Sequence, residues 1–159
     1  MTAASGIAAL ALLAGLAFWL GPLDPGIVQL QFAATPRAFA AIVHAWGPEG
    51  LARYRAHFAV DFALLGCYAV FGWRLARRTA VFAGLPMRGR SVAAWALPAA
   101  ALADAAENTL HLWLTAAPRF SPAWPYALAA ACAAAKWLLL IGFAALLAWA
   151  LARPQPGAR

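Results

Sequence analysis

Four polar side chains on one face of an apolar stretch are the residues of this chain best suited to chemistry. The stretch reads DAAENTLH and places them at positions i, i+3, i+4 and i+7: Asp104, Glu107, Asn108 and His111. In an α-helix these positions fall within about 100° of arc, so the side chains would share one face. Carboxylate, amide and imidazole groups gathered in a membrane segment typically bind a polar ligand or pass protons.

A matching polar stripe and a single lysine occur in two other apolar stretches. The stripe has spacings of three, four and seven residues and consists of Tyr54, His57, Asp61 and Tyr68. Lys136 is the only lysine, and it lies about eleven residues, or about 16 Å of helix, from the nearer end of its stretch. Because that depth exceeds the reach of a side chain toward water, we expect Lys136 to point inward and to pair with Asp104 or Asp61.

The composition indicates a membrane protein. Of the 159 residues, 65% are hydrophobic and 11% are charged, whereas a soluble domain has about 45–50% apolar and about 25% charged residues. Four windows are mostly apolar, namely residues 1–23, 56–73, 91–118 and 120–152. The sequence therefore predicts an all-α membrane protein, a bundle of four transmembrane helices. It excludes a water-soluble enzyme, a disordered chain and a disulfide scaffold.

The first third of the chain should contain one span and one short helix. Residues 3–20 are expected to form a retained first span rather than a cleaved signal peptide, because no basic residue precedes Arg37. Residues 27–32 alternate between apolar and polar and predict a short extended segment. Thr35 and Pro36 are typical of a helix start, and Gly47 should end a short amphipathic helix in this first loop.

The rest of the chain predicts three long helices, over residues 48–78, 91–115 and 125–152. Residues 79–90 and 116–124 should form the loops between them. Residues 1–152 then make a single transmembrane domain, and residues 153–159 make a disordered polar tail.

The distribution of arginines predicts the orientation. The formal net charge of +7 would suggest nucleic acid in a soluble protein, but these arginines flank apolar helices. Seven lie on the side of the 74–90 loop and four on the other side, which puts both termini in the cytoplasm of a bacterial inner membrane.

The expected partners are the lipid bilayer, a small amphipathic ligand and a second copy of the chain in a homo-oligomer, with no nucleic acid. Cys67 and Cys132 are interpreted as small packing residues.

The candidate site consists of Asp61, Asp104, Glu107, Asn108, His111 and Lys136, with His57 and Tyr68 around them. Three carboxylates against one lysine leave two in excess, so protons, a bound cation, charged histidines or water must compensate. The cluster could hold the helices together, or it could bind a small ligand or relay protons. Three further alternatives are an enzyme using the carboxylates and His111 as acid and base, a metal site at Glu107 and His111, and a haem between His57 and His111.

Familiar catalytic and cofactor motifs do not occur. The sequence has no Gly-rich phosphate loop, no His-Glu-x-x-His pair, no Cys-x-x-Cys pair and no nucleophile elbow. We therefore assign no catalytic residue, no cofactor and no metal.

The order of these features resembles an uncharacterised bacterial family of small four-span integral membrane proteins. The matching segments lie within residues 27–140 and read IVQLQFAATPRAFAAIVHAWGPEG, YRAHFAVDFALLGCYAV, LADAAENTLHLW and AAAKWLLL. The resemblance implies an Asp in span two, an Asp-x-x-Glu-Asn core in span three and a Lys in span four. Here these are Asp61, then Asp104, Glu107 and Asn108, then Lys136. It implies no mechanism.

Overall fold

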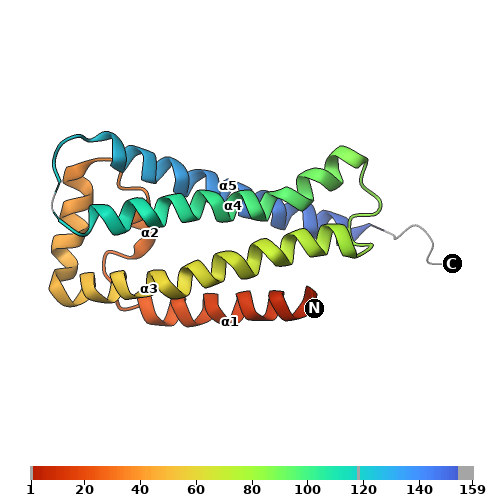
Figure 1. Ribbon diagram of the computed structural model, residues 1–159, viewed down its shortest axis with the longest axis horizontal. Helices are drawn as coiled ribbons and strands as arrows, with labels where there is room; N and C mark the ends of the chain where they lie inside the picture. The colour runs from red at the N-terminus through yellow and green to blue at the C-terminus, as the bar shows by residue number, and fades with distance from the viewer. Residues whose placement is uncertain (1, 118, 154–159) are drawn as a thin grey trace.

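The computed structural model describes residues 2–117 and 119–153, and this part of the chain is helical with no strand (Figure 1). The prediction of an all-α protein is confirmed. Helices α1, α3, α4 and α5 pack in that order, each against the next, and α2 lies in the connection before α3. Their bounds are Thr2–Leu20 for α1, Ile27–Gln31 for α2, Pro36–Arg78 for α3, Met87–Leu114 for α4 and Trp124–Ala152 for α5.

Three of these helices, α1, α3 and α5, are long and apolar enough to cross a membrane. Large apolar side chains point outward from them, among them Phe18, which is 87% exposed, and Leu138, which is 72% exposed. A continuous apolar surface of this kind suits lipid and is unfavourable in water. Helix α4 is 28 residues long but carries the DAAENTLH stripe, and it is not among the three.

A sharp bend divides α3 into a short and a long segment. Thr35 caps the short segment, and its hydroxyl accepts a hydrogen bond of 3.2 Å from the backbone N–H of Ala38. At the bend, Gly47 has φ 64° and ψ −174°, a conformation that glycine adopts without a steric penalty. Pro48 follows at the start of the long segment, where its missing N–H costs little. The predicted short helix ending at Gly47 is therefore present, over residues 36–46.

Two predictions of local secondary structure are wrong. Residues 27–32 were expected to be extended, but Ile27–Gln31 is helical. Ile27 and Leu30 are one turn apart, and both pack on the apolar core, where Leu30 is fully buried. Helix α4 begins at Met87 rather than Ser91, because Arg90 donates its backbone N–H to the carbonyl of Pro86 and so adds a first turn. The predicted tail, residues 153–159, lies outside the described residues except for Arg153.

Two apolar clusters lie at different levels of α4. One includes Leu97 and packs with Ala76, Phe82 and Phe143. The other includes Leu114 and packs with aromatic residues of α3 and with the connection before it. The polar stripe of α4, residues 104–111, lies between these levels.

Close contact between α3 and α4 depends on Gly72. A Cβ at Gly72 would lie 2.7 Å from Cβ and Cδ1 of Leu97, whereas a Cβ at Gly66 would meet nothing within 4 Å. We expect Gly72→Ala to lower stability by about 1–3 kcal/mol, because one of the helices must move. The matched control, Gly66→Ala, should leave stability unchanged or raise it, since alanine favours helix over glycine. Thermal unfolding in detergent micelles, followed by circular dichroism, measures both, and equal midpoints would contradict this packing.

Candidate functional site

Lys136 of α5 is buried between two carboxylates of α4. Its Nζ atom is 3.0 Å from Oδ1 of Asp104 and 2.7 Å from Oε2 of Glu107. Lys136 is 4% exposed and Glu107 is 0% exposed. The expected pairing of Lys136 with Asp104 is present, and Glu107 is a second partner that the sequence did not single out. Within the described residues, Asp61 makes no ion pair with Lys136.

The polar contacts continue from this ion pair in both directions along the bundle. Nδ1 of His111 is 4.0 Å from Oε1 of Glu107, and it makes a hydrogen bond of 2.7 Å with the hydroxyl of Tyr54. On the other side, Tyr68 donates a hydrogen bond of 3.4 Å to Oδ2 of Asp104. Six side chains therefore form a row in which no neighbouring pair is more than 4.0 Å apart: Tyr54, His111, Glu107, Lys136, Asp104 and Tyr68.

The antiparallel packing of α3 and α4 produces this row. Tyr54 meets His111 at one level, and Tyr68 meets Asp104 at another, so increasing residue numbers on α3 face decreasing numbers on α4. Tyr54 and Tyr68 are fourteen residues apart, which corresponds to about 21 Å along the helix. The two polar stripes therefore face each other, and α5 adds its single lysine between them.

Asp61 and His57 are held beside the row rather than in it. Between the two ends, Asn108 donates a hydrogen bond of 2.6 Å to Oδ2 of Asp61. Nδ1 of His57 hydrogen-bonds to the backbone carbonyl of Tyr54. Because a carbonyl only accepts, Nδ1 of His57 must carry the proton, which leaves Nε2 as an acceptor. The structure thus brings together all eight residues that the sequence selected.

One buried oxygen in the row lacks a donor. Neither carboxylate oxygen of Glu107 makes a hydrogen bond of good geometry among residues 2–117 and 119–153. Oε2 lies 2.7 Å from the ammonium of Lys136, whereas Oε1 lies 4.0 Å from Nδ1 of His111. A buried acceptor left unsatisfied is unfavourable. A proton on Oε1, or a small movement of His111 toward it, would relieve that cost.

Two residues connect the polar cluster to cavities. His57 borders a cavity of about 330 Å³, whose other wall includes Gly15 and Leu16 of α1. Tyr68 borders a cavity of about 500 Å³ between α1, α3, α4 and α5, with otherwise apolar walls that include Phe71 and Leu97. The Lys136, Asp104 and Glu107 group itself is buried among the helices.

The short segment of α3, residues 36–46, covers the Tyr54 end of the row. Phe39 packs on the ring of His111 with centroids 5.4 Å apart, and Trp46 packs on Tyr54 at 5.0 Å. Both are buried, at 3% and 8% exposure. The apolar stripe predicted for this segment therefore faces the bundle and separates His111 from the outside.

The sequence did not single out Tyr54 or Arg55 as site residues. The spacing of three residues from His57 placed Tyr54 in the polar stripe, but Tyr54 was not selected for the candidate site. Arg55 was interpreted as an orienting charge at a span end, but it binds the end of α4. Its Nη1 donates to the carbonyl of Leu112 at 3.0 Å and to the hydroxyl of Thr115 at 2.7 Å. A cation at a helix C-terminus is favourable there.

The arrangement does not favour a metal ion. In the part of the chain that the structure describes, no group of three His, Cys, Asp or Glu side chains is placed to hold one. The position between Asp104 and Glu107, where a cation would bind, is taken by the ammonium of Lys136.

Comparisons with protein-family models, with curated proteins and with solved structures found no match. A function must therefore be argued from the geometry of the site.

Removing the buried ammonium should destabilise the bundle. Lys136→Met keeps the length of the side chain but leaves Asp104 and Glu107 side by side without a cation, and such changes cost about 3–5 kcal/mol. Adding Asp104→Asn and Glu107→Gln to Lys136→Met should restore much of the loss. Thermal unfolding in micelles measures the effect, with Leu138→Met on the exposed face of α5 as control. A Lys136→Met protein as stable as the wild type would contradict the ion pair.

Proposed function

We propose that this chain is a four-span protein of a bacterial inner membrane that relays protons along its buried polar row. The observation that carries the proposal is the unbroken sequence of titratable side chains from Tyr54 to Tyr68, with neighbours no more than 4.0 Å apart. Ionisable residues inside a membrane bundle are costly and typically belong to proton or ion pathways. The row extends over about two-thirds of the ~30 Å hydrocarbon core.

The contact between Glu107 and His111 is the part of the row that can form and break. On one side Glu107 contacts the ammonium of Lys136 at 2.7 Å, and on the other its free oxygen faces Nδ1 of His111 at 4.0 Å. His111 is meanwhile bonded to Tyr54. In the proposed relay, the Tyr54 hydroxyl gives a proton to Nδ1 of His111, and the His111 ring moves toward Glu107 and gives that proton to Oε1. A proton that enters at the Tyr54 end of the row restores the hydroxyl. Lys136 then exchanges protons between Glu107 and Asp104, and Tyr68 ends the row beside the 500 Å³ cavity.

Four spans and cytoplasmic termini belong to the same proposal. Helix α4 is long enough to cross, and its polar face is turned toward α3 and α5 by the contacts of Asp104, Glu107 and His111. Its exposed residues include Trp95 and Leu102, which suit lipid. The arginines of the 74–90 loop support a cytoplasmic position for that loop and, with four spans, for both termini.

Labelling from one side of the membrane tests the number of spans. Gly84→Cys and Ser121→Cys, on either side of α4, would be compared in a chain with Cys67→Ala and Cys132→Ala. In right-side-out vesicles, a membrane-impermeant maleimide should label position 121 and not position 84. Labelling of both positions from the same side would mean that α4 does not cross.

Proton flux in liposomes tests the relay. The purified protein would be reconstituted with an internal pH-sensitive dye, and a potassium gradient with valinomycin would drive proton entry. We expect Glu107→Gln to lower the protein-dependent flux about tenfold or more, because the amide cannot pass a proton. The control is Thr109→Ala, at an exposed position of the same helix α4 and outside the row, which should retain the flux of the wild type. Equal flux in wild type, Glu107→Gln and empty liposomes would contradict the relay.

A second candidate function is structural, and the full burial of the ion pair favours it. Lys136 joins α5 to two residues of α4, and polar contacts of this kind hold membrane helices together. The two functions differ in the effect of Glu107→Gln on folding. A relay residue can be replaced by its amide with the fold kept, whereas a clamp residue cannot be replaced without loss of accumulation or thermal stability.

A further inference from the structure

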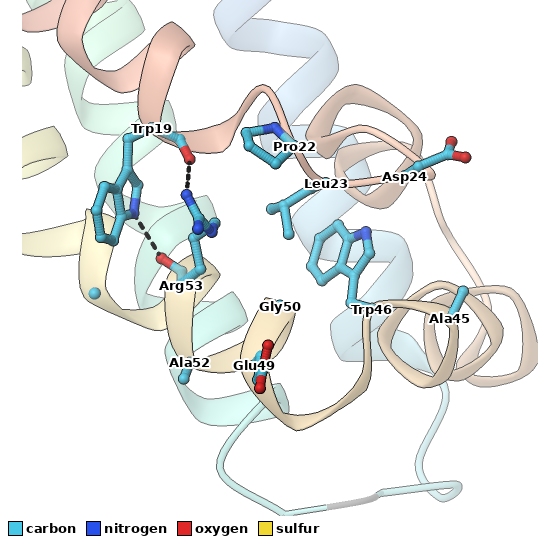
Figure 2. Close-up of a pocket in the computed structure, with 11 residues that line it drawn as sticks. Trp19, Pro22, Leu23, Asp24, Ala45, Trp46, Glu49, Gly50, Ala52 and Arg53 are labelled. Carbon is cyan, nitrogen blue, oxygen red and sulfur yellow. Dashed lines mark hydrogen bonds between the residues drawn. The ribbon is translucent and has the colours of Figure 1, made fainter.

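A third cavity, of about 610 Å³, lies at the end of the bundle where α1 stops (Figure 2). Its walls come from the turn after α1 and from α3 on both sides of the Gly47 bend. Gly50 allows these parts to approach, because a Cβ there would lie 2.7 Å from Cβ of Trp46 and 3.2 Å from Cδ2 of Leu23. The indole N–H of Trp46 donates to the carbonyl of Pro25 and holds the turn against α3.

Arg53 is fixed at one wall of this cavity without an acidic partner. Its Nη1 donates to the carbonyl of Trp19 at 2.9 Å, and the indole of Trp19 donates to the carbonyl of Arg53 at 3.1 Å. The guanidinium also lies 4.8 Å from the centre of the Trp19 ring. No carboxylate of the described residues is within 4.0 Å of it. A positioned guanidinium with donors to spare is a typical partner for phosphate.

Two carboxylates line the same cavity and are likewise not neutralised by the protein. Glu49 is one helical turn before Arg53 on α3, and Asp24 is on the turn after α1. Neither makes an ion pair within the part of the chain that the structure describes. In Figure 2, Arg53 and Trp19 lie on one side, Trp46 and Leu23 on the other, and Glu49 between them on α3. Glu49 and Arg53 are at helical spacing for a salt bridge but do not form one, which leaves both charges for a ligand that carries both signs.

The position of the cavity identifies the kind of zwitterion. Trp19 is next to the last residue of α1, an apolar helix long enough to cross a membrane, and tryptophans at span ends lie at the level of lipid head groups. The molecules found at that level are phospholipids. We propose that the cavity binds the head group of a phospholipid that carries a primary ammonium, with the phosphate at Arg53 and the ammonium at Glu49.

The aromatic residues explain why a primary ammonium is expected. A quaternary ammonium is recognised by open aromatic faces. Here the Trp19 ring is 44% exposed but already has the Arg53 guanidinium over it, which would repel a second cation, and Trp46 is only 8% exposed because it packs on Tyr54. The groups that remain are carboxylates, which accept hydrogen bonds from N–H and not from a methylated nitrogen. A lipid without an ammonium would leave the carboxylate of Glu49 unpaired and be disfavoured.

Native mass spectrometry of the full-length protein in detergent tests this assignment. Phosphatidylethanolamine, phosphatidylcholine and phosphatidylglycerol with identical acyl chains would be titrated separately, and the bound fraction measured. We expect phosphatidylethanolamine to bind about tenfold more tightly than the other two lipids. A gain in affinity of this size corresponds to one charge-assisted hydrogen bond between the ammonium and a carboxylate. Equal binding of the three lipids would overturn the proposal.

Two variants with a matched control locate the site. Glu49→Gln, on an exposed side chain that the fold does not need, should remove the preference for phosphatidylethanolamine over phosphatidylcholine. Arg53→Gln should weaken binding of both lipids, whereas Arg37→Gln, an exposed arginine outside the cavity, should change neither. If Glu49→Gln keeps the full preference, or if a folded Arg53→Gln protein binds both lipids like the Arg37→Gln protein, the lipid is not in this cavity.

Discussion

A single ammonium buried among apolar helices is the constraint on which the rest of the structure depends. Lys136 cannot remain charged inside the bundle without partners, and α4 supplies two of them, Asp104 and Glu107. These contacts fix the rotation of α5 against α4. With that face of α4 turned inward, Asn108 and His111 must also find partners, and Asp61 and Tyr54 of α3 provide them. One costly charge thus orients three helices, while apolar side chains cover their outer surfaces.

The long helix α3 connects this network to the 610 Å³ cavity at the end of α1. Three consecutive residues point in three directions, as the helical advance of about 100° per residue requires. Arg53 lies against Trp19 in the cavity, Tyr54 bonds to His111 in the buried row, and Arg55 caps the end of α4. Trp46 contacts both regions, because it lines the cavity and packs on Tyr54. A lipid bound at Arg53 would therefore sit one residue away from the end of the proposed relay.

The sequence predicted best those site residues whose burial in a membrane costs the most free energy. Periodicity and the scarcity of charge were enough to select Asp104, Glu107 and Lys136, since a membrane bundle tolerates such residues only inside. They could not decide which carboxylate Lys136 would contact, because the relative height of α4 and α5 depends on packing such as that of the cluster that contains Leu97 and Phe143. The prediction of an extended segment at residues 27–32 was also wrong because of packing. The alternating pattern suggested a strand, but a helix allows both Ile27 and Leu30 to pack on the core. The 610 Å³ cavity was not predicted, because its walls come together only through the bend at Gly47.

The most direct measurement of the central interaction uses the fact that Lys136 is the only lysine. Protein labelled with ¹⁵N at lysine Nζ and with ¹³C in the carboxyl groups of Asp and Glu gives one ammonium signal in solid-state NMR of lipid bilayers. The account predicts strong dipolar dephasing of this signal by one Asp and one Glu carboxyl carbon, each at about ion-pair distance. Glu107→Gln, labelled in the same way, should lose the Glu contribution and keep the Asp contribution. A lysine signal that shows no dephasing by either carboxyl group would contradict the account.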